Sequence, residues 1–93
     1  MSAAEVAYAP NRWFVQLTNA PSVAGTSKQA LQAEKKAFRD AARAAGATFN
    51  ERFAFDTLWN GLSIQASPDA MEKIKSLPGV TAAFPVILIE APE

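Results

Sequence analysis

Cysteine and histidine are both absent from this sequence. Without cysteine the chain has no disulfide and no thiolate nucleophile, and without histidine it lacks the commonest side chain for acid–base catalysis and metal binding near neutral pH. An excess of charge of either sign is also absent, because nine basic residues balance nine acidic ones. We therefore expect no enzyme, metal or cofactor, and no attraction to nucleic acid or to an anionic membrane.

Long apolar runs are missing as well. The longest, residues 82–89, contains Pro85 and is far shorter than the roughly 20 residues of a membrane helix. Residues 1–5 have neither the basic opening nor the apolar centre of a secretory signal. What remains is 93 residues with 49% apolar content, enough for one small domain with a single core.

The clearest pattern runs from residue 60 to residue 80. Apolar and polar residues alternate over 61–66, which predicts a strand with one buried face. Ser67 then supplies a helix N-cap, and Pro68 suits the first helical position because it has no N–H to leave unpaired. This helix has four apolar residues on one face: Ala70, Met71, Ile74 and Leu77. Pro78 and Gly79 end it before a final strand over 80–89.

The first half of the chain predicts a strand over 12–18, a helix from Ser27 to about residue 45 stopped by Gly46, and a strand over 47–55. In the first strand Trp13, Val15 and Leu17 share one face. The helix has a predicted buried stripe of Leu31, Phe38, Ala41, Ala42 and Ala45. Its five basic residues are expected on a solvated surface: Lys28, Lys35, Lys36, Arg39 and Arg43. In the second strand three aromatic residues share one parity: Phe49, Phe53 and Phe55.

The element order β-α-β-β-α-β predicts an α+β domain of the ferredoxin-like kind. Its antiparallel sheet has four strands in the order 4-1-3-2, with both helices on one face. Pro85 cannot donate to a ladder, so we place the last strand at an edge. We assign residues 1–11 to a loose leader, 12–89 to the domain and 90–93 to a carboxyl-terminal tail.

The other face of this sheet is predicted to be bare, and function has to be sought there. Strand alternation places five side chains on it: Phe14, Gln16, Trp59, Ser63 and Gln65. A buried structural role for Trp59 is an equal alternative, since a bulge at Gly61 would change the parity. The glycines are isolated from one another and the carboxylates are scattered, so no phosphate loop or paired acid–base site is predicted.

Three segments in this order resemble the propeptide domain of subtilisin-like serine proteases, a family that also includes free-standing inhibitors. They are residues 12–17, the strand that begins Asn60-Gly61, and the helix that begins Ser67-Pro68 and ends Leu77-Pro78-Gly79-Val80. The resemblance covers nearly the whole chain from Arg12 onward. It implies a ferredoxin-like fold, in agreement with the periodicity.

The resemblance also implies a mechanism. The bare sheet face docks on two surface helices of the protease, through residues such as Phe14, Gln16, Trp59, Ser63 and Gln65. A carboxyl-terminal tail enters the substrate cleft as an added strand. Here that tail is Ile87, Leu88, Ile89, Glu90, Ala91, Pro92 and Glu93, with Leu88 and Ile89 as pocket fillers. The resemblance also implies a role for the domain as a folding template for its protease.

The chain departs from this family where well-studied bacterial members carry acidic residues that cap the two protease helices. It has Phe84-Pro85-Val86 there, so the acidic contact is not carried over. We expect a monomer when free, bound by its cognate protease and secreted within a protease precursor. A free-standing inhibitor could instead be cytoplasmic. The alternative function is a ferredoxin-like regulatory or interaction module that dimerises through its open sheet face.

Overall fold

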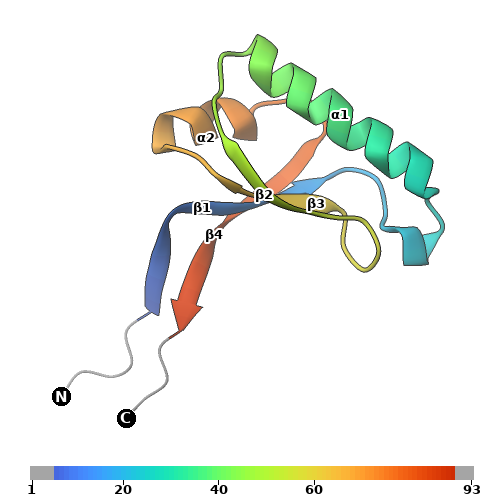
Figure 1. Cartoon of the computed structure of the whole chain (residues 1–93), viewed down its shortest axis with the longest axis horizontal. Coiled ribbons are helices and arrows are strands. Elements are labelled where there is room, and N and C mark those ends of the chain that lie inside the picture. Colours follow the sequence, from blue (N-terminus) through green and yellow to red (C-terminus); the bar gives the residue numbers. More distant parts are fainter. Residues whose placement is uncertain (1–5, 90–93) are drawn as a thin grey trace.

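A computed structural model describes residues 6–89 of the chain, and the side chains of residues 11–86. Its elements in chain order are β1 (Val6–Leu17), a short 3-10 helix η1 (Ser22–Ala24), α1 (Lys28–Ala44), β2 (Asn50–Phe55), β3 (Gly61–Gln65), α2 (Pro68–Lys75) and β4 (Val80–Ile89). The single sheet has the strand order β2-β3-β1-β4, and all neighbouring strands are antiparallel. Both helices lie on the same side of it (Figure 1). This is the predicted ferredoxin-like fold, with β4 at an edge.

The starts of both helices and the stop of α1 follow the local sequence as predicted, whereas α2 ends at Lys75, before Leu77. Ser27 Oγ accepts a hydrogen bond from the backbone N–H of Ala30 at 3.1 Å, and Ser67 Oγ accepts one from Ala70 at 3.2 Å. After α1 the chain passes through Gly46 at φ 76°, a left-handed conformation that glycine adopts without a Cβ penalty.

The core lies between the sheet and the two helices. Its fully buried members include Val15, Leu62 and Ile64 from the sheet and Met71 and Ile74 from α2. α1 contributes Leu31, Phe38 and Ala42, as predicted, whereas Ala41 is only half-buried and Ala45 is exposed. Lys35 is the larger correction, because it is buried rather than solvated.

β1 begins at Val6, six residues earlier than predicted. Residues 6–11, assigned to a loose leader, are therefore part of the sheet, and residues 1–5 lie outside the described residues. The prediction was wrong because Pro10 breaks the alternation. The strand accommodates this break with a bend, since its pairing with β4 shifts register between Tyr8 and Trp13 and Asn11 takes a positive φ of 55°.

β2 contains a bulge that reverses the predicted faces of two aromatic residues. Glu51 pairs with Ile64 and Phe53 pairs with Ser63, so Arg52 is an extra residue without a counterpart in β3. The parity of the strand therefore changes at this point. Phe49 packs toward the core against Phe38, whereas Phe53 and Phe55 lie on the opposite face, and the predicted common face for all three was wrong.

The predicted tail is only partly described. Its first three residues, 87–89, belong to β4 and pair with residues 6–8 of β1. Residues 90–93 lie outside the described residues.

Candidate functional site

Aromatic side chains gather on the sheet face that the helices leave uncovered. We call this surface the aromatic face and define it by Phe14, Phe53, Phe55, Trp59 and Phe84. The rings of Phe14 and Trp59 are 5.9 Å apart and nearly perpendicular, and Phe55 lies 5.6 Å from Trp59. Phe53 continues the cluster at 6.3 Å from Phe55. Edge-to-face and tilted contacts at these distances are favourable for aromatic pairs.

The strand register explains why the rings line up. Phe14 is directly opposite Ser63 on one side and Phe84 on the other, and Ser63 is opposite Phe53. Residues directly opposite each other point to the same face of an antiparallel sheet. A continuous row therefore crosses all four strands, and three of its four side chains are phenylalanines.

These rings remain accessible despite their mutual contacts. Phe53 is 60% exposed, Phe84 48%, Phe55 37% and Phe14 36%. One exposed apolar residue is ordinary, but a contiguous apolar patch on a small domain marks an interaction surface. The aromatic face is the strongest candidate for such a surface in the described part of the chain.

Trp59 lies over Gly61, and this position admits no larger residue. A Cβ on Gly61 would lie 2.5 Å from Trp59 Cη2 and would also collide with the backbone carbonyl oxygen of Val15. The missing side chain lets the indole cover the strand and meet Phe14. The alternative for Trp59 required a bulge at Gly61, and this bulge is absent, since Gly61 pairs regularly with Gln16 and Phe55.

All five residues predicted for the bare sheet face lie on this side of the sheet, but Ser63 is buried at 6% exposed, so little of it is available for contact. Phe14, Gln16, Ser63 and Gln65 are placed there by the β1–β3 register, and Trp59 by its contact with Phe14. The prediction missed Phe53, Phe55 and Phe84. Placing Phe53 and Phe55 on this face required knowledge of the bulge at Arg52. The alternation of the last strand could have placed Phe84 opposite Phe14 once a register between the two strands was assumed.

Buried polar contacts with α1 hold the loop that carries Trp59. Lys35 of α1 donates to Asn60 Oδ1 at 2.8 Å, and these residues are 4% and 2% exposed. Asn60 Nδ2 donates to Glu34 Oε1 at 2.7 Å and to the carbonyl of Asn19 at 2.9 Å. Burial lowers the pKa of Lys35, and the carboxylates of Asp56 and Glu34 oppose this shift.

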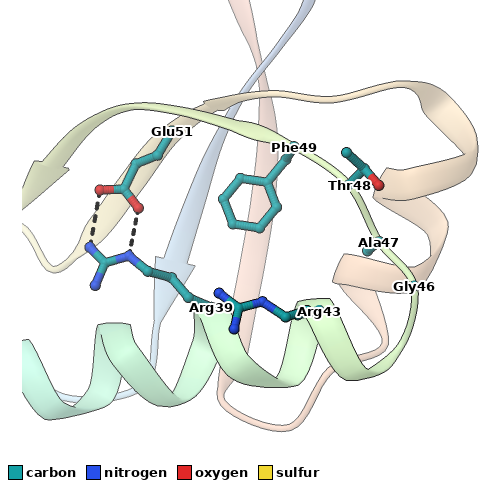
Figure 2. A pocket seen from close by; sticks show the side chains of 7 residues that line it. All are labelled: Arg39, Arg43, Gly46, Ala47, Thr48, Phe49 and Glu51. Atoms are coloured by element: carbon teal, nitrogen blue, oxygen red, sulfur yellow. Dashed lines mark hydrogen bonds and ion pairs between the residues drawn. The ribbon is translucent and has the colours of Figure 1, made fainter.

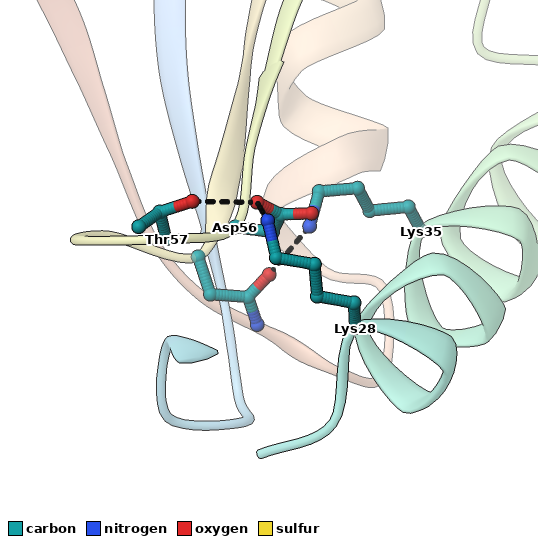
Figure 3. A network of polar contacts seen from close by, with 5 residues as sticks. Lys28, Lys35, Asp56 and Thr57 are labelled. Carbon is teal, nitrogen blue, oxygen red and sulfur yellow. Dashed lines mark hydrogen bonds and ion pairs between the residues drawn. The ribbon is translucent and has the colours of Figure 1, made fainter. Parts of the chain in front are cut away.

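Further contacts fix the same loop at its start. Lys28 lies 3.7 Å from the carboxylate of Asp56 (Figure 3). The backbone carbonyls of Asp56 and Thr57 accept hydrogen bonds from the N–H groups of Ser22 and Val23 at 2.7 and 3.1 Å. α1 and the η1 segment thus position the indole that completes the aromatic face.

A separate surface hollow of about 380 Å³ lies where α1 approaches β2, between Arg39, Arg43, Thr48, Phe49 and Glu51 (Figure 2). The guanidinium of Arg39 donates two hydrogen bonds to the Glu51 carboxylate, at 2.7 and 3.0 Å. This pairing raises the pKa of Arg39. Because the guanidinium and carboxylate satisfy each other, this hollow is better explained as part of the fold than as a ligand site.

The described residues offer no arrangement for metal chemistry. No group of three or more acidic side chains among residues 6–89 is placed to hold a metal ion. Within the same residues, no helix combines the length and apolar character needed to cross a membrane.

The edge of the sheet beyond β4 is the second accessible feature. β4 is last in the strand order, so its backbone has a partner only on the β1 side among the described residues. Unpaired N–H and C=O groups along such an edge can pair with a strand of another protein. Phe84 on the same strand links this edge to the aromatic face.

No protein-family model, curated protein or solved structure matches this chain. The resemblance to subtilase propeptides therefore stays a prediction, and function must be argued from the aromatic face and the β4 edge.

Proposed function

We propose that this domain binds and inhibits a subtilisin-like serine protease, and that it assists the folding of that protease. The observation that carries the proposal is the aromatic face, a row of accessible rings across a sheet that has helices on its other side only. Such a face is apolar and preformed, so it can dock on a protein surface with little rearrangement. The sequence resemblance supplies the class of partner.

The β4 edge accounts for inhibition. Docking through the aromatic face would bring the adjacent edge strand to the partner, where its outer backbone groups can add to an edge of the substrate cleft. Main-chain pairing would hold residues 87–93 in the cleft in an extended conformation, and alternate side chains would set selectivity. A chain held in this manner excludes substrate.

Assistance in folding follows from the same binding. A domain that binds the native protease and not its unfolded chain stabilises the native state by mass action. No additional site is needed for this role.

The test is an inhibition assay against a panel of subtilisin-like proteases, using the full chain and a chain that ends at Val86. We expect the full chain to inhibit and the shortened chain to inhibit much more weakly, because the cleft-binding segment is gone while the aromatic face remains. Undiminished inhibition by the shortened chain would reject the role of residues 87–93. No inhibition by either chain would reject the proposed function.

A second candidate is a module that dimerises through the aromatic face. The central rows of this face hold no charged side chain: one is Phe53, Ser63, Phe14 and Phe84, and the other is Phe55, Gly61, Gln16 and Ala82. Two copies could therefore meet without like-charge repulsion. A tight dimer by sedimentation, together with no protease inhibition, would favour this alternative.

A further inference from the structure

The carboxyl-terminal end of β4 pairs with the amino-terminal end of β1. Residues 6, 7 and 8 are opposite residues 89, 88 and 87, whereas the pairing of β3 with β1 extends only to Arg12. This end of the sheet is therefore a two-stranded ribbon. Figure 1 shows it extending away from both helices, with β1 and β4 side by side.

The ribbon leaves the rest of the sheet at a bend in β1, where the pairing with β4 shifts register. Tyr8 is opposite Ile87 and Trp13 is opposite Pro85, so five steps along β1 correspond to two along β4. The three extra residues of β1 form the bend at which Asn11 has φ 55°. Asn11 is also tied to the sheet, because its carbonyl accepts a hydrogen bond from Ala66 N–H at 2.8 Å. This hydrogen bond anchors the bend from which the ribbon departs.

We propose that residues 6–8 of β1 are an internal template that holds residues 87–89 of β4 in the extended form in which they enter the partner's cleft. This inference rests on the proposed function. It adds a role for residues 6–8, which are remote in sequence from the cleft-binding residues. β1 already pairs with one edge of β4, so only the opposite edge of β4 is free to form backbone hydrogen bonds. A strand of the partner's cleft must therefore pair on that side.

The physical reason for the template is conformational entropy. A single chain loses backbone freedom when it is fixed as a strand, at roughly 1–2 kcal/mol per residue. A chain already paired along one edge has lost much of that freedom before the partner arrives, so the complex forms with higher affinity. A two-stranded ribbon is only marginally stable by itself, and a third strand on the outer edge of β4 would stabilise it in turn.

The test compares four proteins in the same inhibition assay: the full chain, a chain lacking residues 1–5, a chain lacking residues 1–9, and the full chain with Val6→Thr and Tyr8→Thr. Removing residues 1–9 deletes the template without touching the aromatic face, and we expect the inhibition constant to rise roughly 10- to 100-fold. The other two variants keep the backbone pairing. We expect both to inhibit within about threefold of the full chain, a change of less than 1 kcal/mol.

Thermal unfolding of each variant checks that the core is intact, and hydrogen exchange of the amides of residues 87–89 reports on the template directly. We expect faster exchange there when residues 1–9 are removed. Equal or tighter inhibition by that variant, with the full chain inhibiting, would overturn the template and leave the proposed function standing. Failure of the full chain to inhibit would overturn both.

Discussion

Replacement of Gly61 by alanine probes the contact on which the aromatic face is built. The added Cβ would collide with the Val15 carbonyl oxygen across the β1–β3 ladder and lie 2.5 Å from Trp59 Cη2. The indole could swing away, but the carbonyl belongs to the backbone of the central strand. The strands must therefore separate locally, and Trp59 must leave its place over the sheet.

Overpacking of this kind lowers the free energy of unfolding by about 1–3 kcal/mol. For a domain of this size each 1 kcal/mol lowers the melting temperature by about 4–8 °C, so we expect a fall of roughly 5–20 °C by circular dichroism. Ser63→Ala, on the same face of β3, is the matched control because it adds no atom.

A double-mutant cycle with Trp59→Ala separates the two collisions. If the indole were the only obstacle, Gly61→Ala would be almost neutral once the ring is removed. Because the Val15 carbonyl remains, we expect most of the destabilisation to persist in the Trp59→Ala background. A Gly61→Ala protein within about 0.5 kcal/mol of the parent, the range of ordinary surface substitutions, would refute the packing described for this face.

Three other predictions concern the helix side of the sheet. Burial lowers the pKa of Lys35 below 10.5, so between that lowered pKa and 10.5 the unfolded chain binds more protons than the folded one. The free energy of unfolding of the parent, measured in urea, should therefore rise relative to that of Lys35→Met as the pH rises through this window. Ser67→Ala should lower the free energy of unfolding by about 1 kcal/mol, and more than Ser27→Ala, whose cap bond is exposed. A double-mutant cycle on Arg39 and Glu51, both roughly one-third exposed, should give a coupling below about 1 kcal/mol in the same assay. Each assignment has its own contradicting result: a stability difference between the parent and Lys35→Met that does not change with pH, equal losses of stability in Ser67→Ala and Ser27→Ala, or an Arg39–Glu51 coupling energy well above about 1 kcal/mol.

The fold could be predicted from the sequence because its signals are local. Ser67 with Pro68 marks the start of α2, and Gly46 marks the stop of α1, through contacts made within a few residues of the chain. The alternation of residues 61–66 survives in the structure because β3 is central and must bury one face. These elements, in their order, leave few topologies to choose from.

The candidate site was predicted only in part, because its remaining determinants are non-local. The bulge at Arg52 becomes visible only when β2 is set beside β3, and it alone decides where Phe53 points. The burial of Lys35 depends on Asn60, which is 25 residues away in sequence. Pairing of residues 6–8 with residues 87–89 likewise depends on the bend at Asn11, which the sequence shows only as an interruption by Pro10.

The most direct test of the docking face is the inhibition constant of Phe53→Ser measured beside that of Val23→Ser. Phe53 is 60% exposed on the aromatic face and Val23 is 64% exposed in η1, so both substitutions remove accessible apolar surface. A buried phenylalanine covers about 200 Å², so docking would remove about 120 Å² of Phe53 from water, a gross gain of about 3 kcal/mol. Allowing for incomplete burial, we expect Phe53→Ser to raise the inhibition constant by about tenfold or more and Val23→Ser to leave it nearly unchanged. Equal inhibition by the two variants would contradict docking through the aromatic face.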